Sequence, residues 1–133
     1  MANELTVRAA SLSLPDALIP MPLHPNRLRQ RGFNQAHEIA QHIAGNLHLP
    51  VWPHAATRIL DTPPQASLPL KERRKNLRGA FACDNSIQGK RLAIVDDVMT
   101  SGSTLDALSD ILLKGGAAEV QCWVVARALQ HRF

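Results

Sequence analysis

Two adjacent aspartates and a hydroxyl-rich turn close behind them are the residues whose spacing points most clearly to chemistry. Asp96 and Asp97 directly follow an apolar run, Leu92–Val95. The hydroxyl-rich turn begins after two further residues and consists of Thr100, Ser101, Gly102, Ser103 and Thr104. Hydroxyls and backbone N–H groups bind phosphate, whereas carboxylates accept hydrogen bonds from ligand hydroxyls or coordinate Mg²⁺. The pattern therefore predicts a ligand that carries a phosphate and nearby hydroxyl groups.

The hydroxyl-rich turn is predicted to bind a phosphate monoester at the start of a helix. The helix macrodipole and the N–H groups there favour an anion, and Gly102 allows close approach of the backbone because it has no Cβ. Each charge-assisted hydrogen bond contributes on the order of 1.5–3 kcal/mol, against roughly 0.3–2 kcal/mol for the dipole. Direct hydrogen bonds therefore dominate the predicted affinity.

The two aspartates would repel a phosphate, so they are predicted to bind another part of the same ligand. Ribose 5-phosphate derivatives have the required form, because their 2′- and 3′-hydroxyls can donate to Asp96 and Asp97. The same carboxylates can hold Mg²⁺ directly or through water. An acidic strand end or an ordinary helix N-cap explains either half of the pattern alone, but it does not explain both halves together.

Basic residues form two further clusters, and both lie in segments rich in proline or other turn residues. The clusters consist of Arg27, Arg29 and Arg31, and of Lys71, Arg73, Arg74, Lys75 and Arg78. Together with a formal net charge of +4, they indicate an anionic partner. Charge alone leaves a nucleic acid and a small polyphosphate both open.

The elements that must position these residues alternate between strands and helices. Predicted strands cover Asp16–Met21, Val51–Leu60, Phe81–Cys83, Arg91–Val95 and Glu119–Ala128. Apolar residues recur at helical spacing after an N-cap at Asn34, up to an end at Gly45-Asn46, and again from Thr104 to Leu112. A loop is expected from Pro22 to Phe33, residues 1–14 stay unassigned, and the polar stretch 61–78 is predicted to form a loop.

This alternation predicts one α/β domain over residues 1–133, with a mainly parallel sheet flanked by helices on both faces. In such open sheets, ligands bind beyond the carboxyl ends of the strands. Asp96 and the turn that follows it are placed there by the strand that precedes them.

Several other kinds of site and location are disfavoured by the sequence. Cys83 and Cys122 lack metal-ligand spacing, and His37 and His42 lie about 140° apart around a helix, unlike the zinc-binding HExxH pattern. The chain contains no apolar run near the roughly eighteen residues that span a bilayer and no leader-like start. A reduced, soluble, cytoplasmic protein without a membrane partner is expected.

The segment Val95–Thr104 resembles the motif of type I phosphoribosyltransferases that binds 5-phosphoribosyl 1-pyrophosphate (PRPP). Two further segments, Pro20–His24 and Arg27–Gln35, resemble the signature of the ComF family within that superfamily. The likeness continues through Gln65, Leu68, Arg73, Asn76 and Gly79-Ala80-Phe81, and covers about Leu18 to Leu129. Family members commonly carry an N-terminal zinc-ribbon module with cysteine pairs, which this sequence lacks.

The resemblance implies a Rossmann-like core that binds PRPP with Mg²⁺ and transfers its phosphoribosyl group to a small nitrogenous acceptor. It assigns Asp96 and Asp97 to the ribose and the metal, and Thr100 to Thr104 to the 5′-phosphate. It assigns the pyrophosphate to Arg27 and Arg31 of the loop after the first strand, and a closing flexible loop to residues 61–78 with Lys71, Arg73 and Arg74.

A non-catalytic reading is open beside the catalytic one. The domain could retain a PRPP or nucleotide site without transfer and act in nucleic-acid handling linked to DNA uptake, as the family's name in competence implies. The basic surface is compatible with both readings. The sequence leaves the acceptor and the oligomeric state open, a homodimer included.

Overall fold

The computed structural model describes residues 6–8, 14–60, 79–99 and 102–127. The strands are β1 (Thr6–Arg8), β2 (Ala17–Pro20), β3 (Ala56–Arg58), β4 (Phe81–Cys83), β5 (Arg91–Met99) and β6 (Glu119–Arg127). The helices are α1 (Pro25–Arg31), α2 (Gln35–Leu47) and α4 (Ser103–Lys114), with a short 3₁₀-helix at Asn85–Ile87. Within these ranges, every helix is too short or too polar to cross a bilayer.

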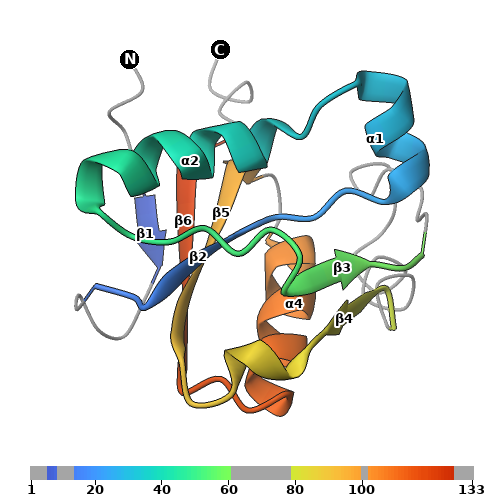
Figure 1. Cartoon of the computed structure of the whole chain (residues 1–133). Coiled ribbons are helices and arrows are strands. Elements are labelled where there is room, and N and C mark those ends of the chain that lie inside the picture. The colour runs from blue at the N-terminus through green and yellow to red at the C-terminus, as the bar shows by residue number, and fades with distance from the viewer. Residues whose placement is uncertain (1–5, 9–13, 61–78, 100–101, 128–133) are drawn as a thin grey trace.

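A four-stranded sheet in the order β1-β6-β5-β2 forms the centre of the domain (Figure 1). β5 pairs in parallel with β2 on one side and with β6 on the other, and β1 adds an antiparallel edge. Leu92–Val95 of β5 is fully buried, as expected for a central parallel strand. The predicted α/β class with a mainly parallel sheet is confirmed.

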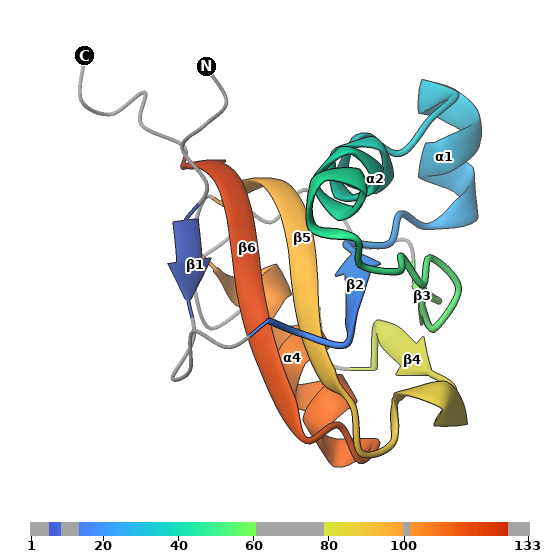
Figure 2. The ribbon, with the colours of Figure 1, turned by 60° about the vertical axis from the view of Figure 1, so that its left-hand side comes forward.

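The two faces of the sheet are covered by different helices, which Figure 2 shows on opposite sides. Ala93 and Val95 of β5 pack with Leu18 and Trp123 against Ala40 and Ala44 of α2. Leu92 and Ile94 point the other way, because successive strand residues alternate between faces, and they join the cluster around Leu105, Leu108 and Leu112 of α4. This double burial fixes β5, and with it the position of the residues at its carboxyl end.

Helix α2 begins at the predicted cap and ties its start to the end of β2. The Asn34 side chain accepts a hydrogen bond from the backbone N–H of Ala36 at 3.0 Å and donates one to the Met21 carbonyl at 3.1 Å. The helix ends later than the predicted Gly45-Asn46, because His48 adopts the left-handed conformation that closes it.

The prediction of a loop from Pro22 to Phe33 was wrong over α1. Its start combines an N-cap at His24, whose side chain accepts from the Asn26 N–H, with Pro25 in the first helical turn, and Gly32 closes it at φ 84°. Proline is tolerated at that position, so the residues taken as helix breakers are helix starters. The helix buries no residue and therefore leaves no apolar period in the sequence.

The other differences concern edges of the fold. β1 lies in the unassigned N-terminal segment and pairs through Val7 with Trp123. The predicted strand Val51–Leu60 is mostly irregular, since Val51 makes one isolated bridge to Leu18 and only β3 continues as a strand. β3 pairs with β4 in a separate antiparallel ribbon, in which Arg58 lies opposite Phe81. The predicted loop at 61–78, between these two strands, falls outside the described residues.

Candidate functional site

The acidic pair lies within a strand and not in the turn after it, because β5 continues past the predicted end at Val95. Asp96 is held beside Val124 of β6 by parallel pairing, and both Asp96 and Asp97 are half-buried. A hydrogen bond joins the two side chains, so the carboxyl groups lie next to each other near the carboxyl end of the strand. The pair directly follows four fully buried residues of a central strand.

Asp96 has a pKa far above the ordinary value of an aspartate. Burial raises the pKa of Asp96 to about 7, and the hydrogen bond and negative charge of Asp97 add to the increase. The backbone N–H of Asp97, 2.9 Å from Asp96 Oδ1, and the charge of Arg58 act in the opposite direction. Near neutral pH this carboxyl therefore exchanges its proton readily, and a ligand cation or hydroxyl donor can shift it to the charged form.

The helix predicted after the acidic pair is confirmed as α4. Gly102 is buried, has φ 84° and is the N-cap of the helix, and its carbonyl accepts from the backbone N–H of Asp106 at 2.8 Å. Ser103 begins α4 and Thr104 is half-buried in its first turn. The first N–H groups of a helix have no partner within it, so this end can receive an anion. Thr100 and Ser101 lie outside the described residues, as does the side chain of Ser103.

The acidic pair has the side-chain chemistry to bind Mg²⁺ together with a substrate. In the described part of the chain, no group of three or more His, Cys, Asp or Glu side chains is arranged to hold a metal ion. Mg²⁺ is commonly bound by one or two carboxylates together with substrate phosphates and water. Asp96 and Asp97 could supply those carboxylates.

The arginines expected to bind pyrophosphate lie on α1. Arg27 is half-buried and Arg31 is exposed. Neither is among the residues that line the pocket described next. Lys71, Arg73 and Arg74 fall in the range that the structure does not describe. The predicted basic residues are thus only partly placed.

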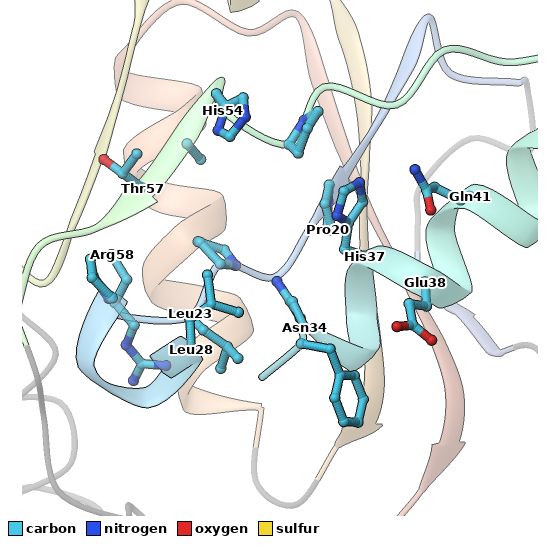
Figure 3. Close-up of a pocket in the computed structure, with 15 residues that line it drawn as sticks. Pro20, Leu23, Leu28, Asn34, His37, Glu38, Gln41, His54, Thr57 and Arg58 are labelled. Atoms are coloured by element: carbon cyan, nitrogen blue, oxygen red, sulfur yellow. The ribbon is translucent and has the colours of Figure 1, made fainter. Parts of the chain in front are cut away.

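A pocket of about 460 Å³ opens beside the end of β2, between α1, α2 and β3 (Figure 3). Its wall is largely apolar, with Pro20, Pro22, Leu23, Leu28 and Phe33 among the lining residues. β2 connects it to the acidic pair, because the Met21 N–H donates to the carbonyl of Val95, the residue before Asp96, at 2.8 Å. The volume falls in the range of small-molecule sites.

Polar groups enter this pocket from two sides. In Figure 3, Arg58 and Thr57 come from β3, and Glu38 and Gln41 come from the opposite side on α2. The guanidinium carbon of Arg58 lies 5.2 Å from the centre of the Phe81 ring. Sequence reasoning missed Arg58, because it stands alone in a predicted strand, outside both basic clusters and every motif.

Comparisons with known proteins agree with this geometry. Residues 55–133 match the model of the phosphoribosyl transferase domain family. The chain is 41% identical over 122 residues to DNA utilization protein YhgH of Escherichia coli O157:H7, covering 92% of this chain and 54% of that protein. It is 41% identical over 124 residues to competence protein F of Haemophilus influenzae, covering 91% of this chain and 54% of that protein. The chain thus spans about half the length of these curated relatives.

A solved structure supports the fold independently. The chain is similar to glutamine phosphoribosylpyrophosphate amidotransferase from B. subtilis, with a TM-score of 0.53 and 19% identity, over 84% of this chain and 22% of that one. At this identity the likeness concerns the fold. The domain match, which covers more than half of the chain, shows that the chain belongs to the phosphoribosyl transferase domain family, and the relatives named for competence agree with its resemblance to the ComF family.

Proposed function

We propose that this domain binds PRPP together with Mg²⁺ and transfers the phosphoribosyl group to a nitrogenous acceptor, releasing pyrophosphate. One observation carries the proposal. The central strand β5 carries Asp96 and Asp97 close to its carboxyl end at Met99, and the next described element, α4, begins at Ser103 after its N-cap Gly102. The residues proposed to bind the ribose hydroxyls and the 5′-phosphate are therefore only a few positions apart in the chain and are carried by two elements of the core.

The proposed roles follow from what each group can donate or accept. Asp96 and Asp97 accept from the ribose hydroxyls, and the start of α4 donates N–H groups to the 5′-phosphate. Mg²⁺, when bound, neutralises charge on the pyrophosphate. The nucleophile displaces pyrophosphate at C1 through a transition state with positive charge on the ribose. Catalysis then consists mostly of positioning and of charge stabilisation by nearby carboxylates.

The pKa of Asp96 also bears on the proposed function. A carboxyl that is partly protonated near pH 7 becomes a better acceptor when the ribose hydroxyls and the metal favour its charged form. Ligand binding is then accompanied by proton release. Because protons are released, the binding enthalpy measured by calorimetry should depend on the ionisation enthalpy of the buffer. A non-specific phosphate site would not show this dependence.

A second candidate function is favoured by the names of the relatives. Proteins called DNA utilization protein and competence protein F are about 41% identical to this chain, and its net charge is +4. In this alternative the domain binds PRPP or a nucleotide without transfer, or contacts nucleic acid directly, as part of DNA uptake. Binding to single-stranded DNA that weakens steeply with salt supports it.

Two measurements on the whole chain test these functions. Calorimetry with PRPP, with and without Mg²⁺, should detect binding that depends on the metal. Pyrophosphate release from PRPP, measured against a panel of nucleobases and other amines, should then identify an acceptor. Binding without release of pyrophosphate with any acceptor favours the non-catalytic alternative, and an absence of PRPP binding contradicts both PRPP-based readings.

A further inference from the structure

The pocket beside β2 contains one guanidinium group among the residues that line it, that of Arg58. The remaining lining residues are mostly proline and other apolar residues, with a carboxylate at Glu38. An arginine at the wall of a largely apolar pocket meets less screening by water than one on an open surface, so its charge acts more strongly on a ligand. The pocket is therefore suited to a ligand with an anionic group at the Arg58 side.

Arg58 is also the link between this pocket and the acidic pair. Its charge acts on Asp96, where it opposes the effect of burial on that carboxyl. Pro20, which lines the pocket, lies opposite Val95 in the sheet, one residue before Asp96. A ligand whose ribose is held at Asp96 can therefore extend into the pocket toward Arg58.

The guanidinium has a fixed support. It stacks over Phe81, which is buried and lies directly across the β3–β4 ribbon from Arg58. A planar cation held on an aromatic face loses little further freedom on binding, and the planar arrangement of guanidinium N–H groups matches the oxygens of a phosphate. Arg58 thus has the preorganisation that the exposed Arg31 on α1 lacks.

We propose that Arg58 binds the pyrophosphate group of PRPP at the pocket beside β2, next to the acidic pair. The inference rests on the proposed function and adds a residue that no sequence motif marks. Glu38 lies on the opposite side of the pocket in Figure 3, so repulsion keeps the pyrophosphate on the Arg58 side. Two anionic groups of the ligand are then bound apart, the 5′-phosphate at α4 and the pyrophosphate at Arg58.

The same contact assists the reaction. The bond between ribose C1 and the pyrophosphate oxygen breaks, the electron pair stays on that oxygen, and the acceptor nitrogen forms the new bond to C1 and then loses a proton. Negative charge therefore grows on the leaving pyrophosphate, where the guanidinium can stabilise it. Arg58 should contribute to catalysis as well as to binding.

The test compares PRPP with ribose 5-phosphate, which lacks the pyrophosphate. Arg58→Gln should weaken PRPP binding about 10- to 100-fold, the loss expected for a charge-assisted hydrogen bond, and leave ribose 5-phosphate affinity unchanged. Arg58→Lys should restore part of the PRPP affinity, because a lysine keeps the charge but not the planar pair of donors. Arg91→Gln, at the far end of β5 in a surface ion pair with Asp16, is the matched control and should bind both ligands as the wild type does.

The outcomes separate this inference from the function it rests on. If the wild type binds PRPP and Arg58→Gln binds it equally well, the role of Arg58 is wrong while the proposed function stands. An equal loss of affinity for PRPP and for ribose 5-phosphate would show that the stacking on Phe81 only supports the fold, and it overturns the inference too. If the wild type does not bind PRPP, the proposed function itself fails.

Discussion

The two halves of the candidate site are built on very different supports. Asp96, Asp97 and Gly102 are carried by β5 and the start of α4, and Leu92–Val95, which leads to them, is fully buried. The pocket on the other side is bounded by α1, which buries no residue, and by the short ribbon of β3 and β4. The difference teaches that one half is fixed by the core, whereas α1 in the other half can change with little cost to the fold.

This contrast agrees with what each half is proposed to bind. Ribose and 5-phosphate need the same geometry in every phosphoribosyl transfer, so a rigid frame suits them. Contacts that α1 makes to the leaving pyrophosphate must allow it to depart, so they can lie on a less constrained element. The comparison predicts large effects of substitutions at the end of β5 and smaller, more graded effects around α1.

The largest effect is expected from the acidic pair. Asp96→Asn and Asp97→Asn should each weaken binding of PRPP with Mg²⁺ by about 100-fold or more, because a neutral amide loses charge-assisted hydrogen bonds and a metal ligand. The fold should stay intact, as judged by circular dichroism and thermal unfolding. Asp110→Asn, an exposed acidic residue on α4, is the matched control and should leave the affinity measured by calorimetry unchanged. Unchanged affinity in both site variants contradicts the roles assigned to the pair.

A pH effect on stability should come next. The pKa of Asp96 is about 7 in the folded chain, against an ordinary value of 3.8, so the folded state keeps a proton that the unfolded state releases. The contribution of Asp96 to the free energy of unfolding therefore falls as pH rises from about 4 to about 7, and stays low above that. The loss should amount to a few kcal/mol at most.

Denaturant unfolding of the wild type and of Asp96→Asn measures this contribution. The variant has no titrating group there, so its stability relative to the wild type should increase between pH 5 and pH 8. A constant difference across this range would mean that the carboxyl is not buried as the structure has it. A variant that folds better at pH 8 but binds less PRPP would show that this buried charge is kept for function.

Much of the rigid half could be predicted from sequence because its signals are contiguous. Leu92–Val95 predicted the buried strand, and Thr104 to Leu112 predicted most of α4. The extension of β5 to Met99 was missed, because two charged residues look like the end of a strand when the pairing partner is unknown. β5 continues to Met99 because it pairs in parallel with β6 as far as Arg127. This pairing joins residues far apart in the sequence, so no local pattern reveals it.

In the other half, β4 confirms the predicted strand Phe81–Cys83, but the rest could not be predicted, for physical reasons. Helix α1 buries nothing and so has no hydrophobic period, and its capping residues, His24 and Pro25, resemble a turn. Arg58 comes to lie over the Phe81 ring only when β3 pairs with β4. Residues 61–78 separate these two strands in the sequence, so the contact is not local. Arg27 and Arg31 were chosen from charge clustering and resemblance, which place residues on an element but do not say which of them face a pocket.

Two glycines with the same backbone conformation offer a direct comparison of the halves. Gly102 and Gly32 both have φ 84°, and they lie at the start of α4 and at the end of α1. Replacing either with alanine should cost about 1–2 kcal/mol of folding stability, because the left-handed conformation is strained for a residue with a Cβ. Only Gly102→Ala should also weaken ribose 5-phosphate binding, about tenfold, by keeping the phosphate from the backbone.

Thermal unfolding and calorimetry on both variants decide this prediction. A Cβ on Gly32 meets no atom within 4 Å, so Gly32→Ala reports backbone strain alone and serves as the control. Equal loss of ribose 5-phosphate affinity in both variants would mean that the effect comes from general destabilisation. In that case the phosphate is not bound at the start of α4.

The smallest effects are expected on α1. Arg27→Gln and Arg31→Gln should each weaken PRPP binding by no more than about fivefold, since contacts made by exposed charges are worth roughly 0–1 kcal/mol. The loss should be greater for the half-buried Arg27 than for the exposed Arg31, and it should shrink as salt is raised. Arg29→Gln is the control, because Arg29 bonds to Asn26 within the same helix and has no proposed ligand role. A loss of PRPP affinity at Arg27 or Arg31 as large as that at Asp97 would contradict the contrast between the halves. It would mean that residues of α1 contribute as much binding free energy as the residues carried by β5.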